Sequence, residues 1–326
     1  MDTTESLKSL RRKYWLLTVL CLLLTMPVGG QPIVFTPQWT AQAQFAGYYV
    51  AQEKGFYREA GLQVQIVHPS VSQTAMDRIR NKQSHVTTLL LTQALEIVDQ
   101  GMPLVNILQT SMNNAMVIVS RWNKNPLTQK GDRVGIWQAG FGQIAMCMSQ
   151  KEGLNYNWVH FASNVNLFTT GAVDATLAMS YNEYYQLMQA GMELTEKSIY
   201  RFSEHGYNIQ GDGLYMTRSY YEKHKDQARR FAEASRKGWE WAAAHPEETL
   251  DIVMKYVKEN RVATNVVLQE LMLREVLRLQ IDRESKKREF RLRPDMVRKA
   301  ALLMLENKML KREVNYQELK GEEVKY

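Results

Sequence analysis

The chain has 326 residues, which is enough for two domains of ordinary size, and its formal net charge is +7. Hydrophobic residues make up 45% and charged residues 23%, a globular composition that excludes a disordered or fibrous protein. The basic residues are spread along the chain and form no basic stripe, which argues against nucleic-acid binding.

Residues 1–30 have the order of a secretory signal peptide. Basic residues at 11–13 come first, an apolar run at 15–26 follows, and small residues come after Pro27. The apolar run is shorter than the roughly 20 residues that a membrane-spanning helix needs. We therefore expect export to the periplasm with cleavage near Gly30, and an uncleaved N-terminal anchor is the open alternative.

Residues 31–120 alternate short apolar runs with stretches of helical periodicity. This alternation predicts a parallel sheet that is covered by helices on both faces. We expect strands at 33–35, 62–67, 85–91, 105–109 and 116–120. We expect the intervening helices to end at Gly55, near Asn81 and at Gly101.

Polar and aromatic residues collect just after the strands of this first lobe. The carboxyl ends of parallel strands lie side by side, and open α/β sheets bind their ligands at that edge. Thr92 is explained equally well as the cap of the following helix. The candidate ligand-binding residues of the first lobe are Trp39, Gln42, Gln44, Tyr48, Thr92, Gln93 and Gln109.

A second series of strands begins after the polar segment 121–130. We expect strands at 131–137, 159–161 and 175–179, and a helix from Gln143 to Lys151. The turn before this helix is rich in glycine, and its backbone N–H groups are suited to a polar ligand group. It lacks the GxGxxG pattern and the P-loop lysine, so it is not a nucleotide fingerprint. The candidate residues of this second lobe are Gly140, Phe141, Gly142, Tyr181, Asn182 and Glu183.

Glu183 has a second explanation, because an acidic side chain in the first turn of a helix is favoured by the helix dipole. We prefer a role of Glu183 in ligand binding, since Tyr181 and Asn182 precede it at the same strand end.

After the second lobe the chain returns to the first. Short strands are expected at 200–203 and 214–217, then helices at 219–223, 226–244, 246–258, 262–281 and 294–308, and an irregular tail from Asn315. Crossings near Arg121 and Gly213 imply a hinge and a cleft between two α/β lobes. The expected division is 1–30 signal peptide, 31–120 with 213–326 first lobe, and 121–212 second lobe.

The sequence offers little support for catalysis. The six histidines are scattered, no metal-ligand spacing is legible, and no GxSxG motif occurs. Cys21 lies in the N-terminal apolar run, and Cys147 has the pattern of a small core residue. We expect a protein that is not an enzyme and that has no cofactor and no metal.

Four blocks of the chain resemble the NMT1/THI5-like family of thiamine-pyrimidine substrate-binding proteins, which is related to the SsuA-type sulfonate- and taurine-binding proteins of ABC importers. The blocks are QWTAQAQFAGYYVAQEKGFYREAGLQV at 38–64, GDRVGIWQAGFGQIAMCMSQKEGL at 131–154, VDATLAMSYNEYYQL at 173–187, and the segment at 212–257.

The resemblance implies a type II periplasmic-binding-protein fold, with two α/β lobes around a hinged ligand cleft. It implies that Trp39 stacks on a ligand ring and that Tyr181, Asn182 and Glu183 contact the polar edge of that ring. It also implies a thiamine pyrimidine precursor as the small-molecule ligand, an ABC permease in the inner membrane as the partner, and a monomer.

Several departures bear on function. Fungal members that synthesise the pyrimidine carry a CCCFC stretch, a pyridoxal-phosphate lysine and a donor histidine, whereas this chain has Leu89 near the lysine position and Gln93 near the histidine position. A synthase is therefore not expected. A receptor for sulfonate, taurine or another small solute, and a sensor lobe for a membrane kinase, remain as alternatives.

Overall fold

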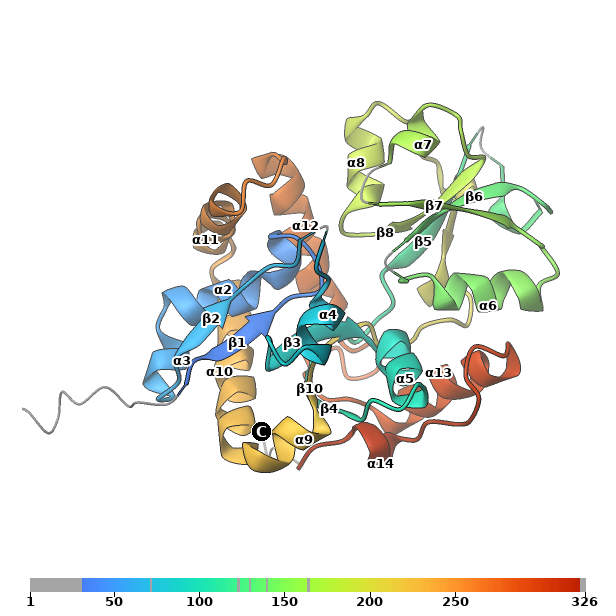
Figure 1. Cartoon of the computed structure of the whole chain (residues 1–326). Helices are drawn as coiled ribbons and strands as arrows, with labels where there is room; N and C mark the ends of the chain where they lie inside the picture. The colour runs from blue at the N-terminus through green and yellow to red at the C-terminus, as the bar shows by residue number, and fades with distance from the viewer. Residues whose placement is uncertain are drawn as a thin grey trace, which may run out of the picture. The chain divides into compact units, whose positions relative to one another are not determined.

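The computed structural model describes residues 31–70, 72–121, 124–128, 130–138, 140–162 and 165–322 (Figure 1). The expected signal peptide, residues 1–30, lies outside these residues. The described residues from Ile33 onward belong to one compact unit, which is the part of the chain considered below.

The strands of the described residues form two five-stranded sheets. The first sheet has the order β2-β1-β3-β10-β4. Its strands are β1 (Ile33–Thr36), β2 (Val64–Ile66), β3 (Val86–Leu90), β4 (Leu104–Gln109) and β10 (Asp212–Thr217). β1 pairs in parallel with β2 and β3, whereas β10 lies antiparallel between β3 and β4. The sheet is therefore mixed. β1 to β4 run in one direction, as predicted for this part of the chain, and the returning strand β10 inserts in the opposite direction.

The second sheet has the order β7-β6-β8-β5-β9. β6 pairs in parallel with β7 and β8, and β5 pairs antiparallel with β8 and β9. Its strands are β5 (Met116–Ser120), β6 (Arg133–Trp137), β7 (Asn157–Phe161), β8 (Ala175–Met179) and β9 (Ile199–Arg201). Met116–Ser120, which we expected in the first lobe, thus lies in the second sheet, and the chain crosses before Met116 instead of near Arg121.

Helices accompany both sheets, and each sheet with its own helices is called a lobe below. The first lobe has α2 (Ala46–Glu53), α3 (Phe56–Glu59), α4 (Ala75–Arg80), α5 (Leu91–Asp99), α9 (Arg218–Lys223), α10 (Lys225–Ala244) and α11 (Pro246–Glu259). The second lobe has α6 (Gln143–Lys151), α7 (Asn166–Thr169) and α8 (Glu183–Gln189). In the ranges given above, no helix is both long and apolar enough to cross a membrane.

Three C-terminal helices complete the fold; the first two contact both lobes, and the third packs against β4. These helices are α12 (Val266–Leu279), α13 (Pro294–Glu306) and α14 (Tyr316–Leu319). α12 packs against α8 and against the short 3-10 helix Ala43–Phe45, and α13 packs against both α5 and α6, beside which Figure 1 shows it. The expected irregular tail instead contains α14, because the Asn315 side chain accepts hydrogen bonds from the backbone N–H groups of Gln317 and Glu318.

Close packing of α2 on α10 sets the position of the loop after β1. Gly47 and Gly238 lie where the helices meet, and a Cβ at Gly238 would collide with the carbonyl oxygen of Gly47. Tyr48 is 1% exposed and packs edge to face on Phe35 and on Trp239, at centroid distances of 4.9 and 5.5 Å. Tyr48 is therefore a core residue, and the loop that ends at α2 is held on a rigid base.

Candidate functional site

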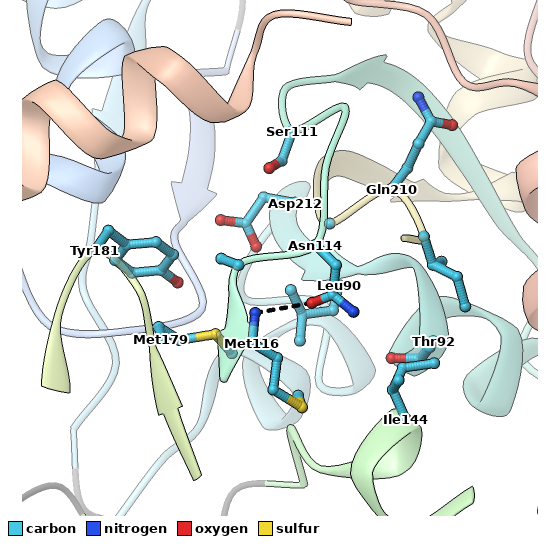
Figure 2. A pocket seen from close by; sticks show the side chains of 13 residues that line it. Leu90, Thr92, Ser111, Asn114, Met116, Ile144, Met179, Tyr181, Gln210 and Asp212 are labelled. Atoms are coloured by element: carbon cyan, nitrogen blue, oxygen red, sulfur yellow. Dashed lines mark hydrogen bonds between the residues drawn. The ribbon is translucent and has the colours of Figure 1, made fainter. Parts of the chain in front are cut away.

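The cleft contains two adjoining cavities with a common wall of Leu90, Met179 and Tyr181. The first, called the Trp39 cavity, is also lined by Gln38, Trp39, Gln42, Gln44, Trp137, Phe141, Asn182 and Glu183. The second, called the Asp212 cavity and drawn in Figure 2, is also lined by Thr92, Ser111, Asn114, Ala115, Met116, Ile144, Ile209, Gln210, Gly211 and Asp212. Each has a volume of about 30 Å³, which is room for one or two water molecules. A larger ligand requires the cleft to widen.

Aromatic rings from the two lobes meet in the Trp39 cavity. Trp39, in the loop after β1, packs edge to face on Phe141, in the turn before α6, with centroids 5.6 Å apart. Phe141 in turn packs on Trp137 at the end of β6, at 6.2 Å. Such rings offer a planar ligand both stacking and edge contacts.

His68 fixes the backbone of the Trp39 loop. Its Nδ1 donates to the carbonyl oxygen of Trp39 at 2.7 Å, so Nε2 accepts from the Tyr49 hydroxyl at 2.8 Å. Burial lowers the pKa of His68 to about 4, although the hydrogen bond to Trp39 opposes this shift. The imidazole is therefore neutral near pH 7 and acts as a rigid hydrogen-bonding bridge.

Glu183 is one of two carboxylates in the cleft and is 3% exposed. One of its oxygens accepts from Trp137 Nε1 at 3.3 Å and Asn182 Nδ2 at 3.2 Å, and the other accepts from the Met179 backbone N–H at 2.9 Å. Burial raises the pKa of Glu183, while the bonds from the Met179 N–H and the Trp137 indole lower it. The carboxylate is oriented by neutral donors alone.

Asp212 is the second carboxylate, and a series of glutamine side chains surrounds it. Asp212 accepts from Gln38 Nε2 at 2.6 Å and from Gln44 Nε2 at 2.7 Å, and Gln44 Oε1 accepts from Gln42 Nε2 at 2.6 Å. A carboxylate only accepts, so both amides that contact it must present their N–H₂ groups. Gln38 Oε1 therefore makes no hydrogen bond to Asp212, and it is buried without a hydrogen-bond partner.

Burial raises the pKa of Asp212, and the hydrogen bonds from Gln44 and Gln38 oppose this shift. Its place in the cleft follows from strand direction. Asp212 is the first residue of β10 and lies opposite Leu90, the last residue of β3, because the two strands are antiparallel. The beginning of β10 therefore lies at the same edge of the sheet as the carboxyl ends of β1 and β3.

Side chains of α5 and α6 join the lobes beside the cleft. Thr92 Oγ1 donates to Gln143 Oε1 at 3.3 Å, and Gln143 Nε2 donates to Glu96 Oε2 at 2.9 Å and to the Gly140 carbonyl oxygen at 2.8 Å. The bonds of Gln143 with Thr92 and Glu96 cross between the lobes and hold the cleft in its narrow form.

The structure places eight of the predicted residues along the two cavities: Trp39, Gln42, Gln44, Thr92, Phe141, Tyr181, Asn182 and Glu183. Others lie outside the lining. Tyr48 is in the core, Gln93 Oε1 accepts from the Leu90 backbone N–H, and Gln109 Nε2 donates to the carbonyl oxygens of Gly211 and Asp212. Gly140 and Gly142 shape the turn around Phe141, and a side chain at Gly142 would collide with Ile136.

Asp212 was missed as a site residue, since Gly211–Asp212–Gly213 has the composition of a flexible turn. An acidic residue two positions before the predicted strand 214–217 was the available signal. Among the lining residues that the structure describes, none is lysine, arginine or histidine. No group of three or more histidine, cysteine or acidic side chains suited to a metal ion occurs in that part of the chain.

Sequence comparison connects the chain to binding and biosynthesis proteins. A family model described as NMT1/THI5 like matches residues 42–249. A provisionally named thiamine biosynthesis protein of Haemophilus influenzae is 25% identical over 272 residues, which is 79% of this chain and 83% of that protein. The formylaminopyrimidine-binding protein of Halalkalibacterium halodurans is 25% identical over 232 residues, with 66% and 68% covered.

Structural comparison gives the fold. The periplasmic aliphatic sulphonate binding protein SsuA from Escherichia coli aligns with a TM-score of 0.63 at 12% identity, covering 91% of this chain and 96% of that one. A ligand-binding component of an ABC-type import system from Staphylococcus aureus aligns at 0.64 with 8% identity, covering 89% and 97%. The predicted family and fold are thereby confirmed. The chain belongs to the NMT1/THI5-like family and has the type II fold of periplasmic substrate-binding proteins of ABC importers.

Proposed function

We propose that the protein is an extracytoplasmic solute-binding protein that captures a small heteroaromatic amine of the thiamine-pyrimidine type and delivers it to an ABC permease. The observation that carries this proposal is the pairing of aromatic rings with two carboxylates, Glu183 and Asp212, that have only neutral hydrogen-bond donors as neighbours. Rings contact a flat ligand, and carboxylates accept hydrogen bonds from its amino groups.

A sulfonate ligand fits this lining poorly. An anionic head group needs cations or converging N–H donors, and a buried carboxylate nearby repels it. The described lining has no cationic side chain, and the N–H groups of Gln38 and Gln44 are already directed at Asp212. These features favour an amine over taurine or an alkanesulfonate.

The proposal assigns no chemical step to the cleft. The described lining consists of amides, aromatic rings, aliphatic side chains, hydroxyl groups and two carboxylates, without lysine, histidine or cysteine. Binding alone is sufficient for the proposed role, because a ligand that contacts both lobes holds them together around itself.

Export and the permease partner rest on the N-terminal sequence and on the fold. Residues 1–30 have the order of a signal peptide. Substrate-binding proteins of ABC importers pass their ligand to a membrane permease, which leads us to propose the periplasm as the location. In a signalling role, the ligand-bound protein would contact a membrane kinase instead of a permease.

Thermal unfolding in the presence of a ligand panel tests the function. A ligand that binds only the folded state raises the midpoint temperature of unfolding. At a concentration of 100 times its Kd, it adds about 2.7 kcal/mol to the free energy of unfolding. We expect a rise with aminopyrimidines. A rise with taurine or alkanesulfonates and none with any pyrimidine would overturn the proposal, and riboflavin in the same panel tests a larger heteroaromatic.

A further inference from the structure

Asp212 lines a different cavity from Glu183. Building on the function proposed above, we propose that Asp212 binds a cationic amino substituent of the ligand, such as a primary ammonium group on a short side chain. The ring of the same ligand occupies the Trp39 cavity, and the substituent crosses the common wall into the Asp212 cavity.

The first support is the absence of a cation beside Asp212. Outside the cleft, the buried acidic side chains of the described residues have one: Glu275 is 8% exposed and pairs with Arg278 at 2.7 Å, and Asp282 is 6% exposed and pairs with Arg293 at 3.0 Å. Asp212 has two amide donors and, within the described chain, no ion pair. A desolvated carboxylate without a counter-ion is unfavourable, and a ligand cation would offset that penalty.

The second support is the direction of the surrounding amides. Because Gln38 and Gln44 direct their N–H₂ groups at Asp212, the buried Gln38 Oε1 is left as a further acceptor without a partner. An ammonium group has three donors and no acceptor, whereas a hydroxyl group has one donor and two lone pairs. Asp212 and Gln38 Oε1 together suit the ammonium group better.

The third support is size and position. The Asp212 cavity holds about 30 Å³, enough for one ammonium-sized group. Gln38 and Gln44 line the Trp39 cavity while Asp212 lines the neighbouring one, so the three meet at the boundary between the cavities. Figure 2 shows the Asp212 carboxylate and the Tyr181 ring turned toward the same space, and Tyr181 belongs to the common wall.

Calorimetric titration of the full chain with three matched ligands tests the inference. The ligands are an aminopyrimidine with an aminomethyl group, its hydroxymethyl counterpart, and the N-formyl derivative of the aminomethyl compound, which keeps the side chain but has no charge. We expect the aminomethyl compound to bind at least about tenfold more tightly than both neutral ligands at pH 7. In Asp212→Asn this preference should fall to about twofold.

The outcomes separate this inference from the proposed function. Equal affinity of the wild-type protein for charged and neutral ligands overturns the inference and leaves the proposed function standing. An equal loss of affinity for all three ligands in Asp212→Asn, in a variant that unfolds as the wild type does, also overturns it, because the preference for the charged ligand then does not depend on Asp212. If no pyrimidine binds the wild-type protein, both proposals fail. Gln38→Met provides a second variant in case Asp212→Asn does not fold. It should lower the affinity for the aminomethyl compound more than the affinity for the two neutral ligands.

Discussion

The Trp39 indole and the Phe141 ring meet edge to face with their centroids 5.6 Å apart, although they belong to different lobes. Trp39 follows β1 of the first sheet, and Phe141 precedes α6 of the second lobe. A planar ligand that enters between them replaces this contact with two ring–ligand contacts. The same pair therefore joins the two lobes across the cleft and binds the ligand in the proposed function.

Trp39→Ala should lower the affinity for an aminopyrimidine by about 10- to 100-fold, because stacking of a base on an aromatic side chain contributes about 1–3 kcal/mol. Calorimetric titration measures this directly. Cys147→Ser is the control, because Cys147 is fully buried in α6, contacts Met309 and is absent from the cleft lining. Burial raises the pKa of the Cys147 thiol to about 12, so the residue is a neutral core side chain near pH 7. Equal affinities of both variants and the wild type would remove Trp39 from the site.

Gln143→Ala should open the ligand-free protein, because it deletes the hydrogen bonds to Thr92 and Glu96 across the cleft. Small-angle X-ray scattering should show a larger radius of gyration than for the wild type. Affinity should fall by about tenfold, since a smaller fraction of the protein is in the closed, binding-competent form. Gln150→Ala, at an exposed position of the same helix, is the matched control. Identical scattering and affinity for the two variants would contradict a role of Gln143 in closure.

Stability should decrease as the pH falls from about 6.5 to about 4, partly because of His68. The folded-state pKa of His68 is about 4, below the ordinary value of 6.5, so between these values the unfolded chain binds a proton that the folded protein excludes. Its contribution is present above about pH 6.5 and is lost as the pH falls through the folded pKa, by roughly 2 kcal/mol after allowance for partial exposure.

Urea unfolding of His68→Gln and of the wild type at several pH values between 4 and 7 measures this contribution. The variant should have a flatter pH profile, because glutamine keeps a donor and an acceptor but does not titrate. His245→Gln, at an exposed histidine, should retain the wild-type profile. Parallel profiles for His68→Gln and the wild type would show that His68 does not contribute to the loss at low pH.

Gly238→Ala should destabilise the protein by about 3 kcal/mol, because the added methyl group collides with the Gly47 carbonyl oxygen and with Ala51 where α10 packs on α2. Chemical denaturation gives the free energy of unfolding. Lys237→Ala, at the exposed neighbouring position, should change it by less than about 0.5 kcal/mol. A similar free energy for Gly238→Ala and Lys237→Ala would show that the two helices separate without penalty.

The sequence by itself determined the strand and helix pattern and most of the cleft lining. The helix Gln143–Lys151 and the strand Ala175–Met179 lie where their periodicity predicts. Trp39 and Glu183 could be predicted because each follows a strand, and Phe141 because it stands in the turn before a helix. Position after a strand is a local property, so a single sequence reveals it.

Only the tertiary structure decided which sheet each strand joins and in which direction. The assignment of β5 to the second sheet depends on pairing with β8 and β9, and the insertion of β10 depends on pairing with β3 and β4. These pairings bring Asp212 beside Gln44, which lies 168 positions earlier in the chain. They also leave Tyr48 in the core between Phe35 and Trp239. The local pattern of apolar residues specifies which face of a strand is buried. The neighbour and the direction of each strand depend on packing between residues far apart in the chain, and a single sequence does not reveal these contacts.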